Sequence, residues 1–293
     1  MRESPFTLVE HLQSPPPEIL WHYTSLDALM KILDSGSIWA SHIRYLNDSS
    51  EYDHMVHTID NRVCELRSEV MSQVIEDPTR CAALTSVHRI LKAGISRVTY
   101  VSSFSAKKDD LSQWRGYCPP GQGVSIGFYS RAIKAAINPA THHPHVNPGQ
   151  LGEVIYLKSD EGRSFDKWIE SACEAPQEDM AVTNTDILRI TISLAAAFYK
   201  DLSFKEEEEW RVILERNSLG GRPSKIHFRL GKSTLIPYQE ITLGTQPHEF
   251  IKEIVVGPSP NLSLSSDAVR HLLRERRASA IEVYETDVPF RHW

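Results

Sequence analysis

The sequence predicts an α+β fold, because strands gather in groups toward both ends of the chain and helices separate them. Segments rich in β-branched and aromatic residues lie at residues 19–41, around one short helix, at 97–157, and from residue 208 to the C-terminus. Strands do not alternate with single helices along the chain. This grouping is typical of an α+β fold rather than of a parallel sheet built from βαβ units.

The chain divides into a short arm and one domain. Pro15–Pro17 interrupt it ahead of the first apolar run, so we expect residues 1–17 to form an N-terminal arm and residues 18–293 a single domain. Helical periodicity over about residues 50–94 predicts a helical insertion between strands of the core.

The first elements have recognisable boundaries. A strand is predicted over residues 19–23. Ser25 is a good helix N-cap and Gly36 stands where a C-terminal cap belongs, so the segment between them predicts a helix. A short strand is expected next, at residues 38–41.

The remaining elements follow from the same two patterns. Strands are predicted at residues 97–105, 123–128, 152–157, 208–215, 224–230, 233–238, 240–244, 251–258 and 280–290. Helices are predicted at residues 51–75, 79–93, 161–174, 182–201 and 263–277. The chain has no internal repeat, coiled-coil heptad or low-complexity segment.

Composition says more about the compartment in which the protein works than about the reaction it carries out. With 32 Lys and Arg against 38 Asp and Glu, the net charge of −6 gives no general attraction to nucleic acid or to an anionic membrane. No apolar stretch approaches the roughly 20 residues that a membrane-spanning helix needs. The 4 cysteines are widely spaced and lack CxxC pairing. We therefore expect a cytoplasmic protein with free thiols and no membrane contact.

Several common enzyme motifs are missing: a Walker A loop, GxGxxG after a strand, HExxH and GxSxG. The densest histidine group, at residues 142–148, is flanked by prolines and has no matching Cys or carboxylate ligands nearby. A solvated loop explains this group better than a metal site, so no metal is predicted.

His22 and two serines are the first candidates for chemistry. His22 lies in a short apolar run, where a histidine either is hydrogen-bonded in the core or holds a ligand. Ser103 and Ser105 share one face of a predicted strand. Their hydroxyls could serve a turn or an edge, hold a neighbouring carboxylate, or bind a ribose.

Two further motifs allow both a structural and a functional interpretation. Trp114 and Arg115 can pack as a cation–π pair, or can stack on a ring and bind a phosphate. The acidic run at residues 206–209 is a solvated face when taken alone. Because it continues into a predicted strand, Glu207 and Glu209 would share one face, where the sheet would hold their carboxylates rigidly.

Together these motifs resemble known families. Residues 20–41, LWHYTSLDALMKILDSGSIWAS, resemble the opening strand, helix and strand of ADP-ribosyltransferases of the diphtheria-toxin and poly(ADP-ribose) polymerase type. The series HYTSL, LND..E, SSFS, QWRGY, E.EWR and a terminal VPFR, from about residue 18 to 291, resembles a widespread bacterial domain family of unknown function. The resemblance implies a split β-sheet core with helical insertions.

The resemblance also implies roles for individual residues. NAD, as substrate, would be bound by His22, Tyr23, Thr24, Ser103, Ser105, Trp114 and Arg115. Glu209 would be the catalytic glutamate, and Glu207 would orient the acceptor. Tyr23 departs from the transferase pattern, in which the stacking tyrosine lies well downstream of the histidine. Stacking on nicotinamide would then fall to Trp39, Tyr45, Trp114 or Tyr117.

The activity that follows is NAD-dependent mono-ADP-ribosyl transfer to a nucleic acid or protein acceptor, in a bacterial toxin or phage-defence effector with an antitoxin as a further partner. Two alternatives stay open: a non-catalytic module of the same fold that binds a nucleotide or nucleic acid, and an NAD glycohydrolase. The transferase assignment expects His22 and Glu209 to converge from opposite sides on one dinucleotide-sized cleft.

Overall fold

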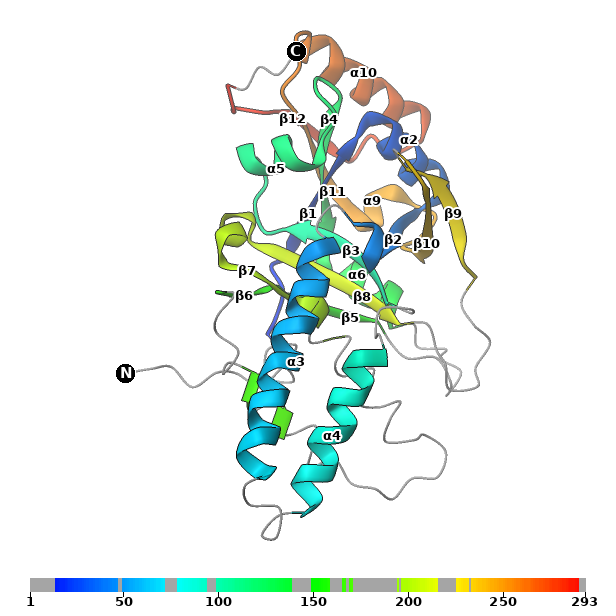
Figure 1. The fold of residues 1–293 in the computed structure, drawn as a ribbon. Helices are drawn as coiled ribbons and strands as arrows, with labels where there is room; N and C mark the ends of the chain where they lie inside the picture. The colour runs from blue at the N-terminus through cyan, green and yellow to red at the C-terminus, as the bar shows by residue number, and fades with distance from the viewer. Residues whose placement is uncertain are drawn as a thin grey trace.

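A computed structural model of the chain has one large mixed sheet with helices packed around it (Figure 1). It describes residues 14–46, 49–71, 78–93, 99–138, 149–158, 165–166, 169–170, 194, 196–215, 225–231 and 233–289. The predicted α+β class is confirmed at this level. Residues 1–13 of the predicted arm, the histidine group at residues 142–148 and most of the predicted helices at 161–174 and 182–201 lie outside the described residues.

The large sheet has ten strands, and eight of them form a continuous path in the order β12-β11-β4-β1-β3-β2-β10-β9. Strand β8 lies beside β3 and also pairs with β5. The strands are β1 (Ile19–Ser25), β2 (Ser37–His42), β3 (Thr99–Ser105), β4 (Gly123–Tyr129), β5 (Gln150–Glu153), β8 (Glu209–Glu215), β9 (His227–Leu230), β10 (Leu235–Thr242), β11 (Ile251–Val256) and β12 (Glu282–Glu285). A separate parallel pair is formed by β6 (Ile155–Leu157) and β7 (Tyr199–Asp201).

The sheet divides where β1 and β2 meet the same edge of β3. The opposite edge of β3 pairs with β8 along its whole length. On the dividing edge, β1 is paired only at Trp21 and Ser105, while β2 is paired at the opposite end, with Tyr100 and Val101. Strand β1 instead pairs with β4 from Ile19 to Ser25. The strands β1 and β2 therefore leave β3 at different points, and this fork separates two halves of the sheet.

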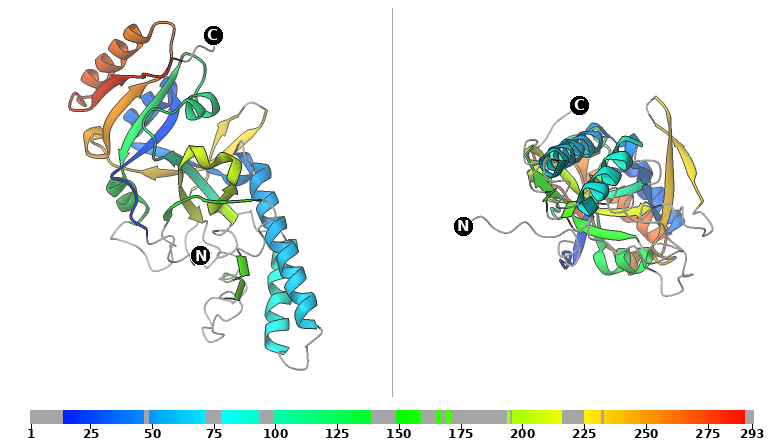
Figure 2. Two further views of the ribbon diagram at one scale, coloured as in Figure 1. Left: turned by 90° about the vertical axis from the view of Figure 1, so that its left-hand side faces the viewer. Right: turned by 60° about the horizontal axis from the view of Figure 1, so that its bottom comes forward.

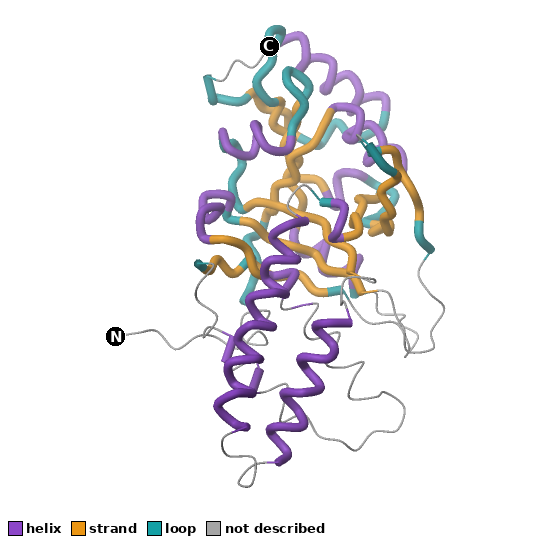
Figure 3. Tube along the Cα trace, viewed as in Figure 1, coloured by secondary structure: helices purple, strands orange, loops and turns teal. Residues whose placement is uncertain are grey.

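The helices cover both faces of the sheet (Figure 3). The α-helices are α2 (Leu26–Ser35), α3 (Ser49–Met71), α4 (Pro78–Ala93), α5 (Leu111–Tyr117), α6 (Ser130–Ile137), α9 (Pro247–Phe250) and α10 (Leu262–Glu275), and short 3-10 turns are η1 (Ile43–Tyr45) and η3 (Leu202–Glu207). The antiparallel pair α3 and α4 projects away from the strand-rich part of the molecule (Figure 2). No helix within the described residues has both the length and the apolar character needed to cross a bilayer.

Three apolar clusters stabilise this arrangement. The largest lies on the face that carries Leu20, Phe104 and Phe128 and includes side chains of α2, α6 and α10. A second joins α3 and α4 to the opposite face through Val101 and Ile213. A third, smaller cluster contains Trp21, Tyr23, Trp114 and Val255 beneath α5. Both faces of the sheet are thus buried. The second and third clusters lie on the same face, and the fork separates them.

Helix α2 has the predicted capped boundaries. The Ser25 hydroxyl accepts a hydrogen bond from the Ala28 N–H at 3.1 Å, and the Gly36 N–H donates to the Ile32 carbonyl at 2.8 Å. Gly36 adopts the left-handed conformation, with φ +63°. Its carbonyl accepts from the Leu243 N–H at 2.8 Å, so this one turn also ties α2 to the end of β10.

Several element predictions need correction. The helix predicted to run to residue 201 is wrong at its end, because Tyr199–Asp201 is strand β7. The predicted strand 152–157 is two strands, β5 and β6, and the predicted strands 233–238 and 240–244 are the single strand β10. Helices α5 and α6 were not predicted. Asp110 is the missed signal for α5, since its carboxylate accepts hydrogen bonds from the N–H groups of Ser112 and Gln113.

Gly36→Ala is expected to destabilise the fold by about 3 kcal/mol or more, through left-handed strain and a backbone clash. A Cβ at Gly36 would lie 1.8 Å from the Gly244 carbonyl oxygen, so the turn could not keep its form. Urea unfolding measures the effect. Gly116→Ala is the control, because a Cβ at Gly116 meets nothing within 4 Å, and it should leave stability unchanged or slightly raised. Equal effects of the two substitutions would contradict this account of the turn.

Candidate functional site

His22 lies at the fork and bridges it. Its imidazole Nδ1 is 2.9 Å from the Ser103 carbonyl oxygen, and its ring centroid lies 5.6 Å from that of Phe104 and 6.4 Å from that of Phe128. Burial lowers the pKa of His22, although the Ser103 carbonyl opposes this. The ring is therefore neutral at pH 7. Because a carbonyl only accepts, Nδ1 carries the proton and Nε2 presents a lone pair.

Tyr23 and Trp114 are core residues, so the prediction that they contact a ligand is corrected. The Tyr23 hydroxyl donates to the Lys107 carbonyl at 2.9 Å and accepts from the Asp110 N–H at 3.0 Å. The Trp114 indole N–H donates to Asp109 at 2.6 Å. The two rings pack edge to face at 4.8 Å and are almost fully buried. Neither offers an exposed ring face on which nicotinamide could stack.

Thr24 and Arg115 differ in their relation to His22: Thr24 lies two residues along β1 and shares its face, whereas Arg115 lies on helix α5. The Thr24 carbonyl accepts a hydrogen bond from the Cys118 thiol at 3.3 Å, and its side chain is partly buried. Arg115 is exposed on α5, whose buried residues are Gln113 and Trp114. Arg115 therefore points away from the sheet.

Four charged residues form a buried cluster beside the fork, which we call the charged cluster. Its members are Lys200 on β7, Glu207 at the end of η3, and Glu209 and Arg211 on β8, with exposed fractions of 0%, 9%, 4% and 7%. The Lys200 ammonium donates to Glu207 at 2.8 Å and to Glu209 at 3.2 Å. Arg211 grips both carboxylate oxygens of Glu209, at 2.8 and 2.9 Å. Such bidentate pairs are the strong form of a charged hydrogen bond.

The two glutamates have opposite pKa shifts. Burial would raise the pKa of Glu209, but the charges of Arg211 and Lys200 prevail and lower it to about 2. Burial raises the pKa of Glu207, against the opposing effects of Lys200 and a hydrogen bond from Tyr117. Glu209 is thus a fixed anion, whereas Glu207 is the better proton acceptor. Paired acids with diverging pKa values are typical of acid–base sites.

The serines position this cluster rather than line a ligand site. The Ser105 hydroxyl donates to the Glu207 carbonyl at 2.7 Å and accepts from the Lys107 N–H at 3.0 Å, which fixes η3 against β3. The Ser103 hydroxyl hydrogen-bonds the Glu209 carboxylate and helps to lower its pKa. Ser103 is therefore the link in the site, since its carbonyl holds His22 and its hydroxyl holds Glu209.

His22 and Glu209 meet through Ser103 but point to opposite faces of the sheet. Ser105 lies opposite both Trp21 and Glu209, and directly paired residues share a face. His22, next to Trp21, then points to the other face, where it contacts Phe104. The expectation that both side chains line one cleft is corrected: neighbouring strands bring them close, while alternation along those strands separates them.

Tyr117 is an aromatic residue that contacts one of the acids directly. Its hydroxyl donates to the two Glu207 oxygens at 3.3 and 3.1 Å. Tyr117 was one of the predicted stacking candidates; of the others, Trp39 packs on Tyr238 with 4.4 Å between ring centroids, and Tyr45 is 41% exposed. The sequence analysis did not predict Lys200 as a member of the site. The available signal was a single lysine closing the apolar run ITISLAAAFYK.

Residues 113–212 match a family described as "Protein of unknown function (DUF2971)". The match includes α5 from Gln113 to Tyr117 and all four residues of the charged cluster. It agrees with the predicted resemblance to a bacterial family of unknown function. No curated protein and no solved structure matches the chain.

Lys200→Met is expected to lower the free energy of unfolding by about 3 to 5 kcal/mol, because it leaves two buried carboxylates with one cation. Chemical denaturation of purified protein measures this loss. Lys205→Met is the control, since Lys205 is exposed on the same turn. Adding Glu207→Gln to Lys200→Met should restore part of the loss. If Lys200→Met costs no more than the control, the cluster does not stabilise the fold.

Acid should weaken the fold through Glu209. Its folded pKa of about 2 lies below the ordinary 4.5, so its ionisation stabilises the fold above pH 4.5, and this stability is lost as the pH falls toward 2. The loss is expected to be roughly 3 kcal/mol. Unfolding measured between pH 6 and 2.5 should show a steeper decline for wild type than for Glu209→Gln. Parallel curves would be inconsistent with the lowered pKa.

Proposed function

We propose that the protein is an NAD-dependent mono-ADP-ribosyltransferase with a split-sheet fold. The observation that carries the proposal is the order of three neighbouring strands, β1, β3 and β8, which bear His22, Ser103 and Glu209 at a fork in the sheet. The resemblance predicted these same three motifs in the same order along the chain. His22 and Glu209 point to opposite faces of the sheet, so the proposal rests on this order of motifs and requires NAD to reach both side chains across the fork.

His22 is suited to recognise a ribose. Its neutral ring has the proton fixed on Nδ1 by the Ser103 carbonyl, which leaves Nε2 as an acceptor of fixed direction. A ribose hydroxyl is a donor that such a nitrogen can accept from. In this role His22 binds and orients the substrate, and it does not exchange protons near pH 7.

Glu209 and Glu207 are suited to the two halves of the reaction. Breaking the bond between nicotinamide and ribose gives the electron pair to nicotinamide and leaves an oxocarbenium-like ribose. A carboxylate held rigidly by Ser103 and Arg211 can stabilise that cation without reorganising. Glu207, with its raised pKa, can accept the proton that the acceptor nucleophile loses when it attacks the anomeric carbon.

The acceptor in this proposal is a macromolecule, either nucleic acid or protein. The α3–α4 hairpin interrupts the core and projects beyond it, so it offers a surface for such a target (Figure 2). A cytoplasmic toxin or phage-defence effector, held in check by an antitoxin, is the setting we propose for this activity.

A second candidate, a non-catalytic nucleotide-binding module of the same fold, is favoured by one specific observation. Both oxygens of Glu209 are already paired, with Arg211 and Lys200, and its side chain is almost fully buried. A carboxylate neutralised in this way stabilises a cation less than a free one does. His22 could still bind a nucleotide in such a module.

Glu209→Gln is expected to reduce nicotinamide release from labelled NAD by about 100-fold or more, as for the loss of one preorganised electrostatic group. NAD binding, measured separately by equilibrium dialysis, should survive. The matched control is Glu208→Gln, because Glu208 belongs to the same acidic run and is exposed. It should retain full activity. Circular dichroism of each variant establishes that it is folded.

The outcomes separate the candidates. Release with transfer to an added nucleic acid or protein supports the transferase, and release without transfer identifies an NAD glycohydrolase. Binding without release supports the non-catalytic module. Neither binding nor release by the wild-type protein would defeat all three.

A further inference from the structure

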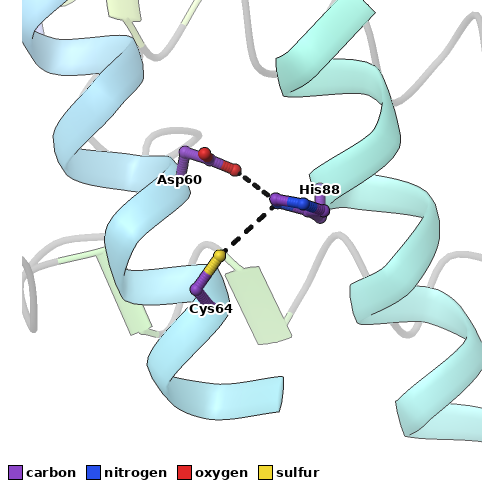
Figure 4. Close-up of side chains that lie close together, drawn as sticks. All are labelled: Asp60, Cys64 and His88. Atoms are coloured by element: carbon purple, nitrogen blue, oxygen red, sulfur yellow. Dashed lines mark hydrogen bonds and ion pairs between the residues drawn. The ribbon is translucent and has the colours of Figure 1, made fainter. Parts of the chain in front are cut away.

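The helical hairpin carries a group of potential metal ligands that is separate from the site above. Asp60 and Cys64 lie one turn apart on α3, so their side chains share a helix face. His88 faces them from α4 (Figure 4). One ligand atom from each residue lies within 4.8 Å of the other two. Among the described residues, this is the group of His, Cys, Asp and Glu that brings three different donor types together.

The distances are close to those of a metal site. The Cys64 Sγ and the His88 Nδ1 are 3.5 Å apart. Two ligands bound tetrahedrally to Zn²⁺, at about 2.0 and 2.3 Å from the metal, lie roughly 3.5 Å from each other. The Asp60 oxygen is 2.7 Å from the same nitrogen, a hydrogen-bond length, so this side chain would have to move by about 0.6 Å.

The chemistry of the donors matches one class of ion. Thiolate, imidazole and carboxylate are together the ligands of Zn²⁺ and similar transition metals, whereas Mg²⁺ and Ca²⁺ prefer oxygen alone. Three protein ligands leave a fourth position for water. Asp60 is buried, with 5% exposure, while Cys64 and His88 are partly buried, so an ion can reach the group from solvent.

Lys92 is a positively charged neighbour that would repel a bound metal ion. Its ammonium lies 3.0 Å from the second Asp60 oxygen, and its side chain is 62% exposed. It therefore contacts the oxygen that His88 does not and is free to turn toward solvent. The first Asp60 oxygen, which now faces His88, is the one that would bind the ion.

We propose that Asp60, Cys64 and His88 form a binding site for Zn²⁺ or a similar divalent transition metal, which links α3 to α4. Because a carboxylate only accepts, the His88 proton that faces Asp60 is on Nδ1. On binding, the Cys64 thiol releases its proton to solvent, and the His88 ring gives up its Nδ1 proton to solvent and takes one on Nε2, so that Nδ1 can coordinate the metal. This inference does not depend on the proposed transferase activity.

Cobalt titration of the purified full-length protein tests the site, because bound thiolate gives Co²⁺ an intense near-ultraviolet band. The band is expected in the wild type and in Cys81→Ser, and it should be lost in Cys64→Ser. Cys81 is the matched control, a partly buried cysteine on the same hairpin. A band that persists unchanged in Cys64→Ser would overturn the proposal.

A measurement on the wild type alone avoids any effect of substitution on folding. Stoichiometric Zn²⁺ should slow the alkylation of Cys64 by iodoacetamide by at least about 10-fold, because a metal-bound sulfur is a poorer nucleophile than the free thiolate. Peptide mass spectrometry reads Cys64 and Cys81 in the same sample, and Cys81 should react at an unchanged rate. Equal Cys64 rates with and without Zn²⁺ would also overturn the proposal.

Discussion

The hydrogen bond between His22 and Ser103 spans the point at which the sheet divides. Strands β1 and β2 share one edge of β3 but pair with its opposite ends, so the middle of that edge has no strand beside it. The Ser103 carbonyl lies there, and the His22 imidazole satisfies it. A buried carbonyl left without a donor would cost about 1 to 3 kcal/mol. The imidazole thus allows the two strands to part without leaving that carbonyl unpaired.

Ser103 connects this fork to the charged cluster on the other face. Its hydroxyl bonds Glu209, whose carboxylate is held in turn by Arg211 and Lys200. Two cations and two acids are buried together, and their mutual pairing offsets the cost of removing them from water. Because each member depends on the others, the position of β7, which supplies Lys200, is tied to that of β8. The cluster consequently holds β8, which carries Glu209, against the end of η3, which carries Glu207.

The sequence was sufficient where local chemistry decides the structure. Helix α2 was predictable because Ser25 and Gly36 specify its two ends, β1 and β3 were predictable from their apolar, β-branched and aromatic residues, and β8 from its side-chain alternation. The fork was not, since pairing between distant strands depends on long-range packing. Alternation along β1 also turns Tyr23 away from His22, into contact with Trp114 of α5, and alternation along β1 and β8 makes His22 and Glu209 point apart. The metal ligands Asp60 and His88 come together only through the antiparallel pairing of two helices.

We propose that the imidazole at the fork recognises NAD. Long-range ¹H–¹⁵N NMR of the histidine rings, with His22 assigned through a His22→Gln variant, tests it most directly. At pH 7 the account predicts a neutral His22 ring protonated on Nδ1, and a shift of the Nε2 resonance when NAD is added while Nδ1 stays protonated. A His22 ring that is charged, or whose Nε2 resonance is unmoved at saturating NAD, would contradict the claim.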